Sequence, residues 1–216
     1  MYRCTLIALL IAIPATAQDH AALCRDLKTR RATVGHWASY AWQGGRAEGT
    51  AMRVAIVGAE KASDSTFYWY EVRVTTREPG DAGRVIMQAL VPGLVYDAAG
   101  MRALVIKSGK DPATRLPDEM VRMMAGRTMN MAAEMTRACL EAELVGWEQV
   151  TVPAGAFRAL HAKTKEGAEA WYTPDLLFGL VKVVTKDGDT MVLTGRGTDA
   201  KSSITETPRS MGGPKN

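Results

Sequence analysis

Short segments of alternating apolar and polar side chains run through most of the chain, and turns rich in glycine and proline separate them. In the clearest segment, FYWYEVRVTT at residues 67–76, successive side chains would face opposite sides of a strand. Further segments of this kind occupy residues 34–42, 52–58, 84–91, 94–98 and 102–107. No helical pattern separates these strands, as the crossovers of a parallel sheet require, so the pattern predicts an antiparallel sheet.

The stretch WEQVTVPAGAFRALHAKT at residues 147–164 holds a histidine, a tryptophan and several charges, and it is either a catalytic loop or a hairpin. Its centre, Pro153-Ala154-Gly155, favours a hairpin, because proline presets φ and glycine accepts positive φ at a turn. Strands at residues 168–173, 179–185 and 190–197 follow. The expected sheet therefore has roughly 9 to 11 strands, more than the usual number.

Two helical patterns interrupt the strands. Residues 18–31 are amphipathic, and residues 117–143 form an insert that starts with Pro117 and two acidic residues, as helix N-termini do. Gly126 is expected to divide this insert into two helices. Methionines at helical spacing give the insert one sulfur-rich stripe: Met120, Met124, Met131 and Met135.

The first seventeen residues, MYRCTLIALLIAIPATA, have the layout of a secretory signal peptide. Arg3 supplies the positive start, residues 6–13 are apolar, and the small residues at the end predict cleavage after Ala17. The apolar run is shorter than the roughly 20 residues of a membrane span. We therefore predict a periplasmic protein without a transmembrane anchor, with one domain at residues 18–198 and a mobile tail at residues 199–216.

Two cysteines remain after removal of the signal peptide, Cys24 and Cys139. An oxidising compartment permits a disulfide between them. Two unconnected buried thiols are the alternative, because the sequence does not give the Cα separation on which a bridge depends.

The residues that carry chemistry are sparse. The formal net charge is +4 with basic and acidic residues interspersed, so no basic stripe favours a nucleic-acid partner. His20, His36 and His161 do not stand at metal-ligand spacing, and no G-x-S-x-G motif is present. Ser108-Gly109-Lys110-Asp111 shares only its Gly-Lys pair with a phosphate-binding loop. We predict no catalytic residue, no metal site and no cofactor.

Two phrases carry a resemblance to a known family: VTVPAGAFRALHAKT at residues 150–164 and WYTPDLLFGLVKVVTKDGDTMVL at residues 171–193. Together they resemble the closing hairpins of periplasmic lipoprotein carriers of the LolA/LolB-like type, and MRVAIVG at residues 52–58 fits the same layout. The resemblance implies a curved, unclosed antiparallel barrel with helices across its concave face. The best-known members of that family carry lipid-modified proteins, but no residue here matches one of their functional residues.

The expected fold is α+β: a strongly curved antiparallel sheet, or unclosed half-barrel, covered by the N-terminal helix and the Met-rich insert. The concave face of such a sheet needs side chains or a guest to fill it. We predict a pocket there for an apolar ligand such as a lipid or an acyl chain. The residues expected to line it are Met52, Val54, Ile56, Phe67, Trp69, Met120, Met124, Met131 and Met135.

The methionine stripe leaves three roles open. It packs the insert on the sheet, lines an adaptable apolar pocket, or captures a soft metal such as Cu(I) through its thioethers. The leading functional hypothesis is a non-catalytic periplasmic binding or carrier protein. The second is a structural module that binds other envelope proteins. The third is an enzyme that pairs His36 or His161 with a carboxylate.

Overall fold

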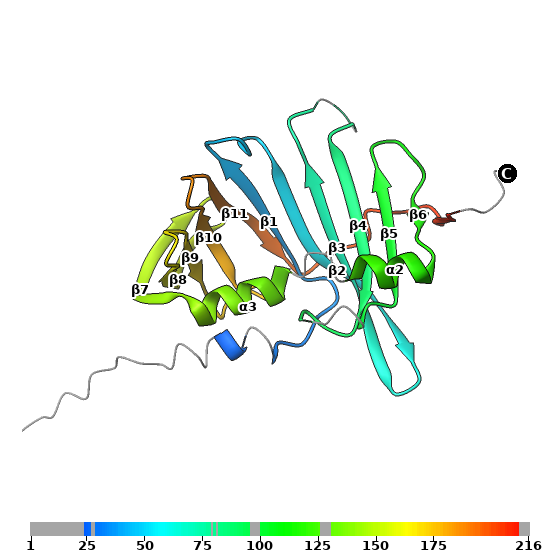
Figure 1. The fold of residues 1–216 in the computed structure, drawn as a ribbon, viewed down its shortest axis with the longest axis horizontal. Coiled ribbons are helices and arrows are strands. Elements are labelled where there is room, and N and C mark those ends of the chain that lie inside the picture. Colours follow the sequence, from blue (N-terminus) through cyan, green and yellow to red (C-terminus); the bar gives the residue numbers. More distant parts are fainter. Residues whose placement is uncertain are drawn as a thin grey trace, which may run out of the picture.

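In the part of the chain that the structure describes, one large sheet of twelve strands forms the body of the protein (Figure 1). The computed structural model describes residues 24–26, 29–78, 80, 82–95, 100–125 and 131–211, so the signal-peptide pattern at residues 1–17 lies outside the described part. The elements in chain order are β1 (Trp37–Gln43), β2 (Ala51–Ala62), β3 (Ser65–Thr75), β4 (Arg84–Val91), β5 (Ala103–Ser108), β6 (Thr114–Arg115), α2 (Asp118–Ala125), α3 (Met131–Glu141), β7 (Glu143–Val152), β8 (Gly155–Lys163), β9 (Glu169–Tyr172), β10 (Leu180–Val184), β11 (Thr190–Gly197) and β12 (Arg209–Ser210).

The strand order joins the two halves of the chain at the centre of the sheet. It runs β12-β6-β5-β4-β3-β2-β1-β11-β10-β9-β8-β7. The early strand β1 pairs antiparallel with β2 on one side and with the late strand β11 on the other. Within the described part of the chain, β12 beside β6 is the one parallel pair. The sheet ends at β12 and β7 without closing, as Figure 1 shows.

The predicted open, curved and antiparallel sheet is confirmed, and most strands lie within a few residues of their expected positions. The prediction missed β6 and β12, which have only two residues each and show no alternation. A strand was also expected at residues 94–98. Leu94 and Val95 instead lie in a bend after β4, and the rest of that stretch lies outside the described residues.

The helical insert forms two helices, α2 and α3, as predicted, while Gly126 between them lies outside the described residues. Of the expected N-terminal helix, Cys24–Asp26 and Thr29 are described and helical. Val121 of α2 is buried in the same cluster as Leu104 of β5. Burial of this side chain places α2 against the sheet.

The register of β2 and β3 separates their side chains onto two faces of the sheet. Ile56 of β2 pairs with Tyr70 of β3, and directly opposed residues point to the same side. This first face carries much of the largest buried cluster, which also contains Leu104 and Val121. The second face of β3 carries the odd-numbered residues, among them Glu71.

The segment 199–211 packs along this second face, although the sequence predicted a mobile tail from residue 199 onwards. Its Ile204 is buried with Ile86 and Val105, and Ser203 donates hydrogen bonds to Glu71. Figure 1 shows the segment in red, behind the strands and leading to β12. The prediction was wrong because it counted large aliphatic residues, whereas polar contacts hold most of this segment.

A disulfide joins Cys24 to Cys139 of α3, with a Cα separation of 5.7 Å and a sequence separation of 115 residues. This distance lies within the range of native disulfides. Both cysteines are fully buried. The bridge therefore ties the start of the domain to α3, which is remote from it in the sequence.

Candidate ligand-binding site

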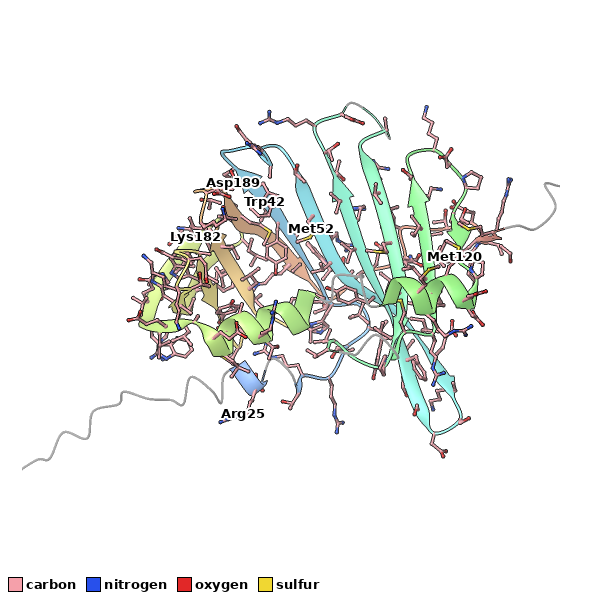
Figure 2. The ribbon with its side chains drawn as sticks, viewed as in Figure 1. Arg25, Trp42, Met52, Met120, Lys182 and Asp189 are labelled. Atoms are coloured by element: carbon pink, nitrogen blue, oxygen red, sulfur yellow. A yellow bond between two sulfur atoms is a disulfide. The ribbon has the colours of Figure 1, made fainter. Side chains whose placement is uncertain are left out.

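Nine residues were predicted to line one pocket, and the six whose side chains the structure describes do not come together. Val54 and Ile56 are fully buried in the largest cluster, and Met52 packs against its margin. Met120 of α2 also packs against this cluster, but Figure 2 shows it well apart from Met52. The side chains that lie outside the described part are those of Met124, Met131 and Met135.

Phe67 and Trp69 lie on the second face of the sheet, away from the other predicted pocket residues. Since Ile56 opposes Tyr70, the odd-numbered side chains of β3 point away from Ile56. Phe67 is buried on that face, and Trp69 Nε1 donates a 2.7 Å hydrogen bond to Glu60 Oε1. Phe67 and Trp69 therefore pack on the face of the sheet opposite to Ile56. The prediction that they line one pocket together with Ile56 is wrong.

A small apolar hollow lies instead between the C-terminal end of α3 and strands β8, β9 and β10. Its volume is about 250 Å³. This is just below the roughly 300 to 1,000 Å³ of typical small-molecule pockets, so it suits a narrow group. The residues that line it are Ala138, Ala142, Ala162, Thr164, Ala168, Glu169, Ala170, Tyr172, Leu180 and Val183.

Alanine side chains create this hollow. Ala138 and Ala142 are four residues apart, and Ala142 N donates to Ala138 O at 3.0 Å, so both lie on one side of the helix end. Ala162 pairs with Ala170, and Ala170 pairs with Val183, so these three share one face of the sheet. Because a methyl group fills little of the space between a helix and a sheet, room remains between them.

These alanines were not among the predicted pocket residues, which were all large apolar side chains. The sequence does contain a pattern that indicates the hollow. Alanines stand in the neighbouring strands, at Ala162 and Ala170, and Ala138 and Ala142 are about one helical turn apart. Recognising it requires the pairing of β8 with β9 and the position of α3, which the disulfide at Cys139 fixes beside Ala138.

The polar residues of the lining are Thr164, Glu169 and Tyr172. Burial raises the pKa of Tyr172 to about 12, so its hydroxyl stays protonated at neutral pH. Lys163 Nζ lies 3.1 Å from Glu169 Oε1, and His161 Nε2 lies 3.0 Å from Glu169 Oε2. These contacts, that of Lys163 first, lower the pKa of Glu169. Because neighbouring residues of a strand point to opposite faces, the carboxylate of Glu169 lies with Lys163 and His161 on the face opposite to Ala170. It is therefore ionised and paired within the protein, away from the hollow.

His161 stands beside carboxylates, as the enzyme hypothesis required, but protein groups already surround it. Its ring stacks on Trp171 with centroids 4.3 Å apart, and its Nδ1 lies 3.6 Å from Glu148 Oε1. Its Nε2 faces Glu169, and the side chain is only 13% exposed. Trp171 Nε1 also donates a hydrogen bond to Glu148 Oε1, and Lys182 Nζ lies 4.5 Å from the centroid of the Trp171 ring. This cluster ties β7, β8, β9 and β10 together.

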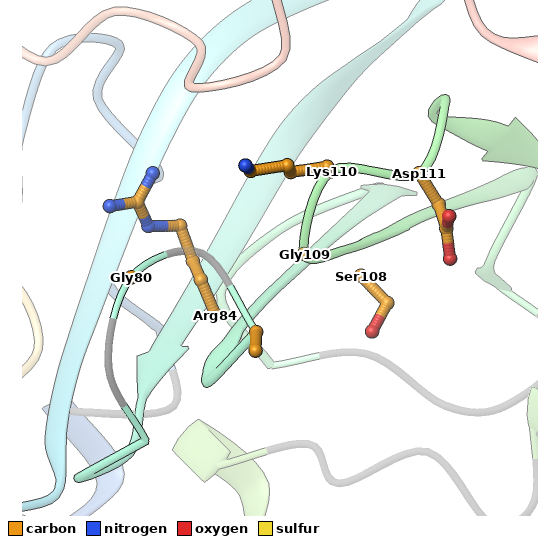
Figure 3. A pocket seen from close by; sticks show the side chains of 7 residues that line it. Gly80, Arg84, Ser108, Gly109, Lys110 and Asp111 are labelled. Carbon is orange, nitrogen blue, oxygen red and sulfur yellow. The ribbon is translucent and has the colours of Figure 1, made fainter.

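Another hollow, larger than the one beneath α3, lies between the β3–β4 connection and the β5–β6 turn. Figure 3 shows Arg84 and Lys110 extending into it, with Ser108 and Asp111 nearby. Gly109 N donates to Arg84 O at 2.8 Å, and Asp111 N donates to Ser108 O at 3.0 Å. These backbone donors are used within the turn, which opens no helix, so the resemblance to a phosphate loop goes no further than the Gly-Lys pair.

No cluster of three or more His, Cys, Asp or Glu side chains arranged for a metal ion occurs among the described residues. None of the helices in the described part of the chain is long and apolar enough to cross a membrane.

No family model and no curated protein matches the chain. Solved structures with some similarity include a putative lipoprotein from Parabacteroides distasonis, which is 12% identical with a TM-score of 0.36 and covers 78% of this chain and 97% of its own. A putative exported protein with a YmcC-like fold from Bacteroides fragilis is 12% identical with a TM-score of 0.37, covering 78% of this chain and 98% of its own.

A DUF1329 family protein from Desulfovibrio piger is likewise 12% identical, with a TM-score of 0.33, and covers 88% of this chain and 92% of its own. Scores of this size identify neither a family nor a function for the chain. The functional conclusion therefore rests on the chain's own residues.

Proposed function

We propose that the protein is an exported, non-catalytic binding protein of the cell envelope that takes an apolar group, such as an acyl chain, into the hollow beneath α3. The observation that carries the proposal is the lining of this hollow, in which eight of ten residues are Ala, Leu, Val or Tyr. An apolar hollow of this kind favours an apolar guest, because water in it finds few hydrogen-bond partners.

Burial of the guest drives binding. Each methylene group that leaves water for the hollow contributes about 0.8 kcal/mol. The disulfide holds α3 at Cys139, next to Ala138, so this wall of the hollow stays in place without a guest. A preformed site avoids the cost of ordering the helix when the ligand binds.

Export is the second part of the proposal. The pattern at residues 1–17 is that of a secretory signal peptide, and a disulfide between Cys24 and Cys139 suits an oxidising compartment. Expression in a bacterium, cell fractionation and N-terminal sequencing test this part. A mature protein in the periplasm that begins at Gln18 supports it, and an uncleaved cytoplasmic chain contradicts it.

Calorimetry with decyl maltoside below its micelle concentration tests binding, because the uncharged head group leaves the apolar chain as the main determinant. The wild-type protein is expected to bind one chain, and Ala170→Leu, which fills the hollow, is expected to lose binding. Ala156→Leu is the control, since Ala156 is exposed in β8 and outside the hollow. Circular dichroism checks that each variant folds. Equal binding by the wild type and Ala170→Leu contradicts the site, and no binding to the wild type contradicts the function.

A further inference from the structure

A second hollow of about 410 Å³ adjoins the apolar one. Both are lined by Ala138 of α3 and Thr164 at the end of β8. Thr164 forms part of the β8–β9 turn, where its hydroxyl accepts a 3.2 Å hydrogen bond from Ala168 N. The apolar hollow therefore borders a second space at the point where α3 meets this turn.

The second hollow is charged, with equal numbers of cations and anions. Apart from Ala138 and Thr164, every residue that lines it carries a charge: Arg137, Glu141, Lys165 and Glu166. Two come from the last turns of α3 and two from the β8–β9 turn, and all four are exposed. Their formal charges cancel, as two positive and two negative.

This charge pattern favours some head groups of an amphiphilic ligand over others. A purely anionic or purely cationic group meets as many like charges as opposite ones, so its net electrostatic gain is small. A group that carries both a phosphate and an ammonium places each part beside an oppositely charged side chain, and charge-assisted hydrogen bonds to phosphate are among the strongest. Balanced charge around the hollow therefore favours a zwitterionic head.

We infer that the ligand is a single-chain amphiphile with a zwitterionic head group, held with its chain in the apolar hollow and its head in the charged one. The inference rests on the proposed function and adds the class of head group. The apolar hollow, at about 250 Å³, is too small for two long chains. The charged hollow is larger, as a phosphate joined to an ammonium group requires.

Four decyl amphiphiles with the same chain test the inference: decylphosphocholine, decyl phosphate, decyltrimethylammonium and decyl maltoside. Each is titrated into the wild-type protein by calorimetry below its micelle concentration at low salt, because exposed charges are screened at high salt. We expect decylphosphocholine to bind about tenfold more tightly than the other three, a difference of about 1.4 kcal/mol.

Paired substitutions test the residues. Glu141→Gln with Glu166→Gln leaves the two cations and is expected to shift the preference towards decyl phosphate. Arg137→Gln with Lys165→Gln leaves the two anions and is expected to shift it towards decyltrimethylammonium. Lys186→Gln is the control, because Lys186 is exposed in the β10–β11 turn and outside both hollows.

The outcomes separate this inference from the proposed function. If the wild type binds all four amphiphiles equally, or if neither paired variant changes the order of affinities, the head-group inference is overturned while the apolar site stands. If the wild type binds none of the four, the proposed function fails and the inference fails with it.

Discussion

Ser203 donates two hydrogen bonds to the buried carboxylate of Glu71, from its backbone N–H to Oε2 at 2.9 Å and from its hydroxyl to Oε1 at 2.7 Å. Gln88 Nε2 adds a third to Oε2 at 2.7 Å. Glu71 is only 1% exposed, so these donors replace the water that it loses on folding. The segment 199–211 thus supplies partners for a charged group that the sheet alone would leave poorly satisfied.

Glu71→Ala is expected to release the segment 199–211 from the sheet. The change leaves Ser203 N–H without its acceptor, which costs about 1 to 3 kcal/mol for a buried donor. Gln88 Nε2 loses one of its two acceptors and keeps the other, Ser202 Oγ. Urea unfolding measures the loss of stability, and trypsin is expected to cut faster at Lys201 and Arg209. The exposed Glu78→Gln is the control. Unchanged cleavage in Glu71→Ala would contradict the anchoring role of the carboxylate.

Glu206 makes the anchoring of this segment depend on pH. Its Oε1 contacts Lys107 Nζ and accepts a hydrogen bond from Ala113 N at 3.2 Å, and these interactions, the first above all, lower its pKa from 4.5 to about 2. A carboxylate with a lowered pKa stabilises the fold above its unfolded pKa. That stability is lost as the pH falls from about 4.5 towards 2.

Urea unfolding of the wild type and Glu206→Gln between about pH 6 and pH 2 measures this dependence. At about pH 6 the wild type is expected to be more stable than Glu206→Gln. The difference in the free energy of unfolding is expected to shrink as the pH falls and Glu206 becomes protonated. A difference that stays constant across the range would show that the carboxylate charge does not hold the segment.

The sheet was predictable from the sequence because its strands alternate strongly and its turns contain Gly and Pro. The segment 67–76 became β3 and residues 190–197 became β11 with almost the predicted ends. The tail was not predictable, because its contacts depend on partners far along the chain. Ser203 reaches Glu71 across 132 residues, and nothing near Ser203 indicates this partner.

The site was harder to predict, since it depends on register. A shift of one residue between β2 and β3 would move Trp69 to the face of Ile56, and alternation within one strand does not by itself show which residues of its neighbour it pairs with. The β-bulge between Ile56 and Gly58 adds a further irregularity that alternation does not indicate. The hollow beneath α3 depends on the pairing of Ala162 with Ala170, which is known only once the hairpin register is fixed.

Gly197→Ala is expected to disturb the start of the C-terminal segment. A Cβ at this position would lie 2.6 Å from Trp37 Nε1 and 2.8 Å from Cε2, which is too close for real atoms. The indole must move, and its 2.8 Å hydrogen bond to Asp199 Oδ1 is then strained or lost. Overpacking of this kind costs about 1 to 3 kcal/mol.

Thermal unfolding and proteolysis at Lys201 measure this effect, and Gly195→Ala is the matched control. A Cβ at Gly195 would lie 3.3 Å from the same indole, so a shift of a few tenths of an ångström accommodates it. A larger loss of stability in Gly195→Ala than in Gly197→Ala would contradict the role given to this close approach.

Loss of the disulfide is expected to destabilise the whole domain and to loosen the hollow at the same time. The bridge closes a loop of 115 residues, and constraint of the unfolded chain by such a loop is worth about 4 to 5 kcal/mol in the chain-entropy model. Cys139→Ser and the double change with Cys24→Ser are expected to lose similar stability, and reduction of the wild type is expected to match them.

Because Cys139 adjoins Ala138, decyl maltoside is expected to bind these variants more weakly even where they remain folded. Calorimetry at a temperature where circular dichroism shows a folded protein separates the two effects, and full affinity in folded Cys139→Ser would show that the bridge does not shape the site.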